Sequence, residues 1–150
     1  MTIQLFVDGS WKSKIPDISG WGFIIFNDKD ELLGYDNGVV KCKSRQIDGE
    51  LTATIKALTY IKENLNNNFN DHSYKVIELY YDYMGIEAWE NGKWKAKSEV
   101  AIAYINSLKD LGDILDKVKF IKVKAHSGQS EGNSLADLLA KEAIDNFIND

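Results

Sequence analysis

The pattern of apolar and polar residues divides the chain into strand-like and helix-like segments. Short apolar runs bounded by turn residues predict strands at residues 3–8, 21–27, 31–41, 76–81 and 118–124. A turn region at residues 9–20, carrying the only proline, Pro16, separates the first two. Apolar residues that recur every three or four positions predict helices at residues 51–65, 99–115 and about 134–148, and the polar run 66–68 is predicted to end the first of them.

The order of these segments predicts the architecture. The first three strands follow one another through turns, which indicates an antiparallel meander. The later strands alternate with helices, and helical crossovers join parallel strands. We therefore predict the α/β class, with a mixed five-stranded sheet of three antiparallel and then two parallel strands, flanked by helices. At 150 residues the chain has the size of one domain, and we expect residues 1–150 to form a single one.

The net charge narrows the choice of binding partners only in part. A formal charge of −5 argues against a sequence-blind, purely electrostatic nucleic-acid binder, because such proteins usually carry a basic excess. The lysines are nevertheless unevenly spread. Three lysines lie in the short loop 93–97 and four lie within residues 117–124, whereas Arg45 is the only arginine. Cations bound by clustered carboxylates would also offset local negative charge, so the overall charge does not decide the partner.

Composition also bears on the cellular setting. No apolar stretch approaches the roughly 18 to 20 residues of a membrane span, and the first residues lack the basic and apolar parts of a secretory signal. The single cysteine, Cys42, excludes an internal disulfide and a multi-cysteine zinc site, which fits a reducing compartment. We expect a cytoplasmic protein that is a monomer and has no membrane partner.

Four acidic residues, each in a different sequence context, are the candidates for a functional site. Asp8 and Asp82 each end an apolar run with strand character, and Glu50 and Asp137 lie near the starts of predicted helices. A carboxylate at the rim of a core is costly unless it is paired or binds a metal. The pattern predicts a divalent-cation site.

Each of these residues also has an ordinary structural interpretation. Ser134 and Asp137 fit a capping box, and Asp48 as the N-cap of the first helix would make Glu50 a common first-turn acid. An aspartate before a glycine, such as Asp8, is typical of turns, and Asp82 fits a strand-end cap. A lone loop histidine, such as His126, is usually just solvated, and His72 reads as a surface residue in a polar turn. Local sequence alone leaves both interpretations open.

Five motifs extend along nearly the whole chain: Asp8-Gly9-Ser10, Gly20-Trp21-Gly22, Gly49-Glu50-Leu51, Tyr81-Asp82, and Val123-Lys124-Ala125-His126-Ser127-Gly128 followed by Asn133 and Ala136-Asp137-Leu138-Leu139-Ala140. With these motifs in this order, the chain resembles the ribonuclease H family, in its bacterial and eukaryotic type I branch. Each motif alone is weak, but five in register are specific.

The resemblance implies a ribonuclease H-like fold and an endonuclease that hydrolyses the RNA strand of RNA/DNA hybrid duplexes. It implies two bound Mg²⁺ ions, with Mn²⁺ as an alternative, and products with 5′-phosphate and 3′-hydroxyl ends. Asp8 would bridge both ions, Glu50 and Asp82 would hold one, and Asp137 the other. His126 would serve proton transfer or product release.

Substrate contacts are expected at a further set of residues. Small or polar groups that approach sugars and bases, together with a basic loop that follows the DNA backbone, make up this set: Gly9, Ser10, Gly22, Gln46, Gly49, Lys93, Trp94, Lys95 and Asn133. Trp21 is expected to be packed instead.

Departures from the family pattern keep two other functions open. Ile47 stands in a segment that commonly carries polar groups, Tyr83-Met84 follows Asp82, and the link from Trp89 to Glu99 is short. The alternatives are a metal-dependent nuclease of this fold that acts on another nucleic acid, and a catalytically silent nucleic-acid-binding module.

Overall fold

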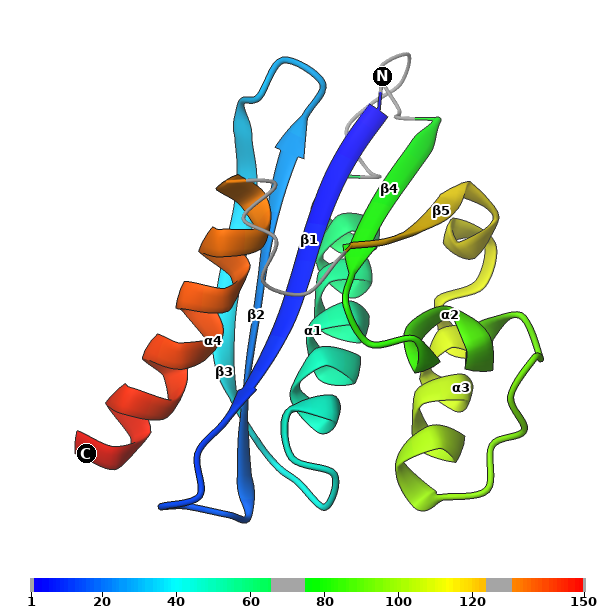
Figure 1. Ribbon diagram of the computed structural model, residues 1–150. Helices are drawn as coiled ribbons and strands as arrows, with labels where there is room; N and C mark the ends of the chain where they lie inside the picture. Colours follow the sequence, from blue (N-terminus) through cyan, green and yellow to red (C-terminus); the bar gives the residue numbers. More distant parts are fainter. Residues whose placement is uncertain (1, 66–74, 124–130, 150) are drawn as a thin grey trace.

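A computed structural model describes residues 2–65, 75–123 and 131–149 of the chain. Five strands form one sheet in the order β3-β2-β1-β4-β5 (Figure 1). β1–β2 and β2–β3 pair antiparallel, whereas β1–β4 and β4–β5 pair parallel. The predicted mixed sheet is therefore confirmed. The strands are β1 (Thr2–Trp11), β2 (Ile18–Asn27), β3 (Leu32–Lys41), β4 (Val76–Tyr81) and β5 (Val118–Lys122).

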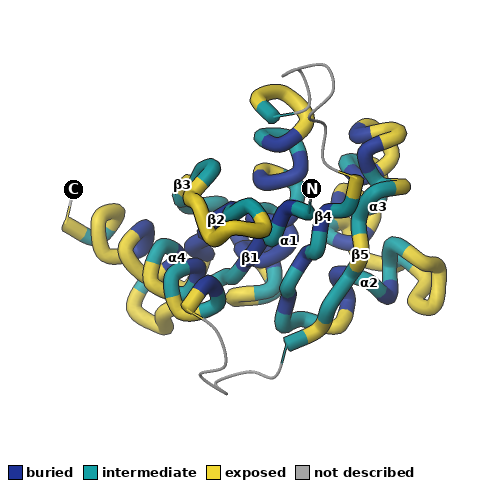
Figure 2. The backbone as a smooth tube through the Cα atoms, turned by 90° about the horizontal axis from the view of Figure 1, so that it is seen from above, coloured by how far each residue is buried: buried dark blue, intermediate teal, exposed yellow. Residues whose placement is uncertain are grey.

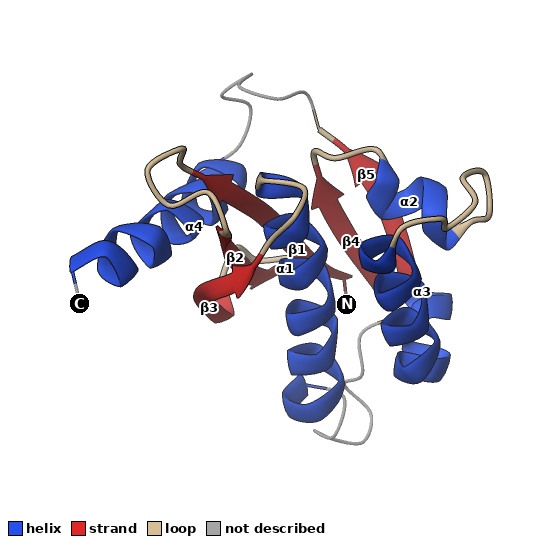
Figure 3. Ribbon diagram, turned by 90° about the horizontal axis from the view of Figure 1, so that it is seen from below, coloured by secondary structure: helices blue, strands red, loops and turns tan. Residues whose placement is uncertain are grey.

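Helices cover both faces of the sheet (Figure 3). α4 packs on β1, β2 and β3 from one side, and α1 packs on the same strands from the other, next to α2 and α3. The α-helices of the described residues are α1 (Gln46–Tyr60), α2 (Gly85–Glu90), α3 (Glu99–Leu111) and α4 (Glu131–Asn149). A π-helical turn, η1 (Ile61–Leu65), extends α1, and a 3₁₀ turn, η3 (Gly112–Lys117), follows α3.

The central strand β1 is apolar on both faces, as expected of a strand covered on both sides. Leu5 and Val7 belong to the larger core under α1, whereas Phe6 belongs to a smaller cluster with Ile24 and Ala136 under α4. Figure 2 shows the buried positions along the inner strands and on the helix sides that face them. Two hydrophobic clusters therefore fix β1 between α1 and α4.

Glycines let both helices approach the sheet backbone. A Cβ atom at Gly20 would lie 2.2 Å from the carbonyl oxygen of Ala140 in α4, and one at Gly9 would lie 2.2 Å from that of Gln46 in α1. Real Cβ atoms do not come this close to backbone oxygens. The two helices can therefore pack at their observed distance only if these positions lack a side chain.

The first two strands extend further than predicted. β1 runs to Trp11 and β2 begins at Ile18, so residues 9–11 and 18–20, predicted as turn, belong to the hairpin. Cross-strand pairing of Ser10 with Gly20 and of Trp11 with Ser19 outweighs the low strand propensity of glycine and serine.

Helix ends differ from the prediction for local reasons. α1 begins at Gln46, so Asp48 is its third residue and not its N-cap. The buried carboxylate of Asp48 instead accepts hydrogen bonds from the backbone N–H groups of Lys43 and Ser44, at 3.0 and 2.7 Å. α2 was not predicted, because six residues are too few to show a helical period.

The last helix also starts earlier than predicted. α4 begins at Glu131, which places Ser134 and Asp137 inside the helix and makes the capping-box interpretation wrong. The predicted helix stop at 66–68, the end of the strand prediction at Lys124 and the surface assignment of His72 lie outside the described residues. No helix in residues 2–65, 75–123 and 131–149 combines the length and hydrophobicity needed to cross a membrane.

Gly20→Ala tests the close approach of α4. The added methyl group would meet the Ala140 carbonyl, which belongs to a helix backbone that cannot move alone, so we expect a loss of about 3 kcal/mol or more in unfolding free energy. Gly92→Ala is the control, since no atom lies within 4 Å of its Cβ position and only its left-handed φ of 84° costs energy, about 1 to 2 kcal/mol. Equal losses in urea denaturation would contradict this packing.

Candidate active site

Asp8 and Asp82 lie side by side because of the sheet topology. β1 and β4 are neighbouring parallel strands, with Phe6 opposite Tyr80. Asp8 comes two residues after Phe6, and Asp82 comes two residues after Tyr80. Because neighbouring strands lie about 4.8 Å apart, the two aspartates are neighbours at the carboxyl ends of β1 and β4, at the same edge of the sheet. The Gly9 N–H donates to Oδ1 of Asp8 at 2.8 Å and fixes one of these carboxylates.

Helix α1 brings Glu50 to this edge. Gly9 touches the first turn of α1, where a Cβ atom would lie 2.5 Å from the Glu50 nitrogen. The Glu50 side chain is only 3% exposed, and its Oε2 accepts hydrogen bonds from the N–H groups of Asp82 at 3.0 Å and Tyr83 at 2.7 Å. Glu50 therefore ties α1 to the turn after β4, while its Oε1 accepts no hydrogen bond from the described residues.

Helix α4 brings Asp137 from the other face. Asp8 pairs with Gly22 across the hairpin, and Gly22 lies directly under the Ala136 carbonyl, where a Cβ atom would come within 2.8 Å. Asp137 is the next residue of α4. One turn later, Nζ of Lys141 lies 2.9 Å from Oδ2 of Asp137.

The four carboxylates line one open cleft of about 510 Å³. Lys141 also lines it, although sequence reasoning missed this residue. Its only signal is the spacing of four from Asp137, which is equally typical of ordinary surface ion pairs on helices. The other lining residues are Val7, Gly9, Ser10, Trp11, Gln46, Ile47, Tyr83, Met84, Val123, Asn133 and Ser134.

Burial and nearby negative charge raise the pKa of Asp8 and of Glu50, which makes these two carboxyl groups unusually weak acids. Burial, together with the negative charges of Asp137 and Asp82, raises the pKa of Asp8 to about 7, against the lowering effect of the Gly9 N–H. Burial raises the pKa of Glu50 to about 8, with further contributions from Asp8 and Asp82 and against the two N–H groups it accepts. Without a cation, the cleft therefore holds an acidic cluster in which Asp8 and Glu50 retain protons to unusually high pH, while Asp137 is paired with Lys141.

This donor set fits hard divalent cations. Carboxylate oxygens are the ligands that Mg²⁺ and Mn²⁺ prefer, and a cation would offset the negative charges that, together with burial, raise the pKa values of Asp8 and Glu50. In the part of the chain that the structure describes, no group of three or more Asp, Glu, His or Cys side chains is arranged so that it could hold a metal ion as it is. The fit of the site to a divalent cation thus rests on the oxygen ligands and the negative charge that the four carboxylates bring to one cleft.

The predicted substrate-contact residues outside the basic loop divide into two groups. Gly9, Ser10, Gln46 and Asn133 line the cleft. Gly22 and Gly49 are buried against protein backbone instead, Gly22 under α4 and Gly49 against the Gly20 carbonyl. The structure thus gives these two glycines a packing role, and their approach to a sugar stays a prediction.

The predicted basic loop lies beside an aromatic cluster. The Trp94 ring lies 5.6 Å from Trp89 and 6.1 Å from Tyr83, and Trp94 is still 38% exposed, next to the exposed Lys93 and Lys95. Trp21 is 7% exposed, which confirms its predicted packing. His126 lies outside the described residues.

Comparisons with known proteins agree with this architecture. The family model described as RNase H matches residues 1–145. A ribonuclease H of Ruthia magnifica is 34% identical over 149 residues, which cover 95% of each chain, and one of Acetivibrio thermocellus is 26% identical over 95% of this chain and 94% of its own. The chain belongs to the ribonuclease H family, and it is a hydrolase of that family.

Solved structures share the fold at lower identity. RNase H1 from Halobacterium salinarum superposes with a TM-score of 0.74 at 18% identity, covering 97% of this chain and 99% of its own. LC11-RNase H1, isolated from compost, gives a TM-score of 0.76 at 20% identity in a complex with an RNA/DNA hybrid, over 97% and 99% of the two chains.

The raised pKa values predict an unusual pH dependence of stability without metal. Between about pH 4, where carboxyl groups of the unfolded chain ionise, and pH 7 to 8, the folded protein holds protons on Asp8 and Glu50 that the unfolded chain has released. The free energy of unfolding should therefore fall as pH rises through this window.

Urea denaturation in EDTA at several pH values measures this slope. Glu50→Gln keeps an acceptor for both N–H groups but does not titrate, so it should flatten the slope. Glu31→Gln, at an exposed turn, should leave it unchanged. Stability that rises across the window, or identical slopes in the parent and Glu50→Gln, would contradict the assigned burial of Glu50.

Proposed function

We propose that the chain is an endonuclease that hydrolyses the RNA strand of RNA/DNA hybrids with divalent metal ions. The observation that carries the proposal is the convergence of Asp8, Glu50, Asp82 and Asp137, from two parallel strands and two helices, on one open cleft. Membership of the ribonuclease H family supports the reaction class, and the hybrid bound by LC11-RNase H1 supports the substrate class. Residues 1–150 would act as one domain, in the cytoplasm and as a monomer.

Asp8, Glu50, Asp82 and Asp137 would hold two Mg²⁺ ions, or Mn²⁺ in their place. When bound, such ions supply an activated water and neutralise charge on the leaving 3′ oxygen. Glu50 would also fix the position of Asp82 through the N–H groups at residues 82 and 83. Lys141 would neutralise Asp137 until substrate and metal enter. His126 remains our candidate for proton transfer or product release.

Selection for RNA would come from the polar groups along the cleft. Ser10, Gln46 and Asn133 line it beside the carboxylates and carry donors and acceptors that can meet 2′-hydroxyl groups or base edges. Gly9 also lines the cleft and stays a proposed contact next to Asp8, although its missing side chain makes room for α1. Lys93, Trp94 and Lys95 would follow the DNA backbone from the loop after α2.

The identity of the cleaved strand and of the product ends tests this proposal. Hybrid cleavage should require a 2′-hydroxyl on the cut strand and leave 5′-phosphate and 3′-hydroxyl ends, because water and not the 2′ oxygen attacks. End-labelled RNA/DNA, RNA/RNA and DNA/DNA duplexes, each incubated with Mg²⁺, with Mn²⁺ and with EDTA, measure both features.

Each other result has a distinct meaning. Preferential cleavage of RNA/RNA or DNA/DNA duplexes would indicate a metal-dependent nuclease of the same fold with another substrate. Binding without cleavage of any duplex would indicate a catalytically silent module. Products with 2′,3′-cyclic phosphates would exclude the attack by water that the carboxylate cluster is proposed to support.

A further inference from the structure

Asp82 differs from the other three carboxylates of the cleft in how its side chain is held. Asp8 and Glu50 accept hydrogen bonds from backbone N–H groups. Asp137 pairs with Lys141. The Asp82 carboxylate accepts no hydrogen bond from the residues that the structure describes. Its direction therefore depends on the backbone turn that carries it.

The turn after β4 hangs between two helices. Its N–H groups at Asp82 and Tyr83 donate to Glu50 in α1, at 3.0 and 2.7 Å. On the other side, the Tyr83 carbonyl accepts the Ile86 N–H of α2 at 3.0 Å. A shift of α2 would therefore move the turn and, with it, the carboxylate of Asp82.

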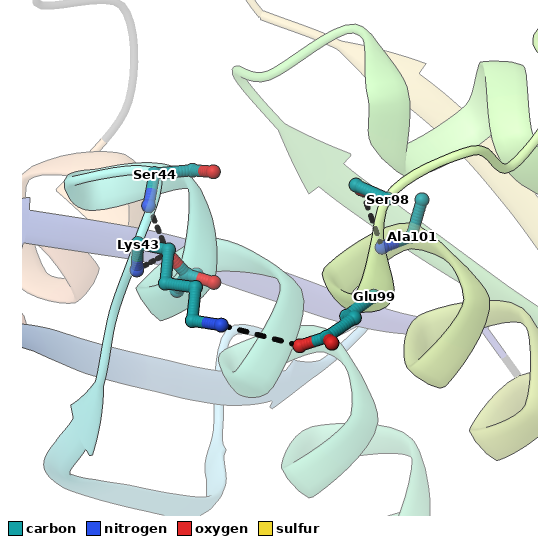
Figure 4. A network of polar contacts seen from close by, with 6 residues as sticks. Lys43, Ser44, Ser98, Glu99 and Ala101 are labelled. Carbon is teal, nitrogen blue, oxygen red and sulfur yellow. Dashed lines mark hydrogen bonds and ion pairs between the residues drawn. The ribbon is translucent and has the colours of Figure 1, made fainter.

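α2 needs support from its neighbours. A helix of six residues is too short to be stable alone. The Tyr104 hydroxyl of α3 donates to the Ile86 carbonyl at 2.8 Å, and its ring lies 6.4 Å from that of Trp89. α3 itself starts with Ser98 as its N-cap, which accepts the Ala101 N–H at 3.1 Å (Figure 4). α3 thus supplies one support of α2.

A tyrosine and a glutamate supply the second support, on the side of the sheet. Tyr81 is the last residue of β4 and comes directly before Asp82. Its side chain is 2% exposed, and its hydroxyl donates to Oε1 of Glu87 in α2 at 2.6 Å. Its carbonyl accepts the Val123 N–H at 2.8 Å. The hydrogen bond to Glu87 thus ties α2 to a strand end that is itself fixed.

The chemistry of this pair favours a role in geometry over a role in stability. The Tyr81 ring packs in the larger core, edge to face with Phe120. An apolar pair of the same shape would often be as stable there, because a hydroxyl and a carboxylate lose hydration on burial. A short hydrogen bond to a carboxylate, however, fixes both distance and direction. An apolar pair cannot do this.

We propose that Tyr81 and Glu87 are positioning residues, which hold Asp82 in the direction in which it binds a divalent cation. This inference rests on the proposed function and adds two residues to it. Neither residue lines the cleft, so the pair acts on the metal site only through α2 and the turn.

Tyr81→Phe and Glu87→Leu each remove the hydrogen bond. Each should raise the Kd for Mg²⁺ about tenfold, the low end of what the loss of a group behind a metal ligand costs. KM for the hybrid at saturating Mg²⁺ should stay that of the parent, because neither side chain reaches the cleft. Glu87→Gln keeps an acceptor oxygen and should restore the Kd to within about twofold of the parent.

The double variant separates positioning from stability. Tyr81→Phe combined with Glu87→Leu should raise the Kd for Mg²⁺ no more than either single change, because both remove the same hydrogen bond. Without metal it should melt at or above the temperature of the parent, since it leaves no buried polar group unpaired. Melting temperatures measured in EDTA and over a range of MgCl₂ concentrations give both quantities.

Tyr80→Phe is the matched control. The Tyr80 hydroxyl donates to Glu78 at 3.2 Å, so this change also removes a hydrogen bond between a tyrosine and a glutamate of the same strand region. Tyr80 packs with Phe6 on the α4 side of the sheet, away from α2. Its Kd for Mg²⁺ and its KM should equal those of the parent.

The possible results have distinct meanings. An equal Kd for Mg²⁺ in the parent, Tyr81→Phe and Glu87→Leu would overturn the positioning role and leave the proposed function standing. A raised KM with an unchanged Kd would also overturn it. A parent that binds Mg²⁺ but prefers another duplex would overturn the proposed substrate alone, because the melting titration contains no nucleic acid and still decides the role of the pair.

Discussion

Like-charge repulsion in a partly buried cluster is the constraint on which this structure depends. Four carboxylates meet at the end of a hydrophobic sheet, and two like charges at 4 Å repel by about 4 kcal/mol at an effective dielectric near 20. The metal-free protein relieves part of this cost by holding protons on Asp8 and Glu50 and by pairing Asp137 with Lys141. Divalent cations would remove the rest, so the same feature that strains the fold would favour the binding of metal ions.

Tight packing around β1 is what brings the four charges together. Gly9 and Gly22 each lie one position from Asp8 along or across the hairpin, and each lets a helix touch the sheet backbone. α1 thereby delivers Glu50 and α4 delivers Asp137 to the same strand. The two hydrophobic clusters on either face of β1 hold both helices in place, and hydrophobic burial thus supports a cluster of charges that would otherwise separate.

The sequence predicts more of the fold than of the local geometry. Short apolar runs identify the five strands, the helical period of apolar residues identifies the long helices, and motif order identifies the family. The sequence pattern misses α2, which is too short to show a period, and the hairpin ends, where pairing overrides propensity. It also misassigns Asp48, whose carboxylate accepts hydrogen bonds from the loop before α1, a contact that only the folded chain shows. It misses Lys141, because its spacing of four from Asp137 in α4 is equally typical of ordinary surface ion pairs.

Asp82→Asn, with thermal melts and hybrid cleavage measured side by side, tests the central claim most directly. The change removes one charge but keeps the shape and the backbone N–H that donates to Glu50. The variant should be at least as stable as the parent without metal, gain less from Mg²⁺ than the roughly 2.7 kcal/mol that a ligand at a hundred times its Kd provides, and cleave almost nothing. If Asp82→Asn is markedly destabilised without metal and cleaves normally, Asp82 is a structural cap and the carboxylates are not the metal site.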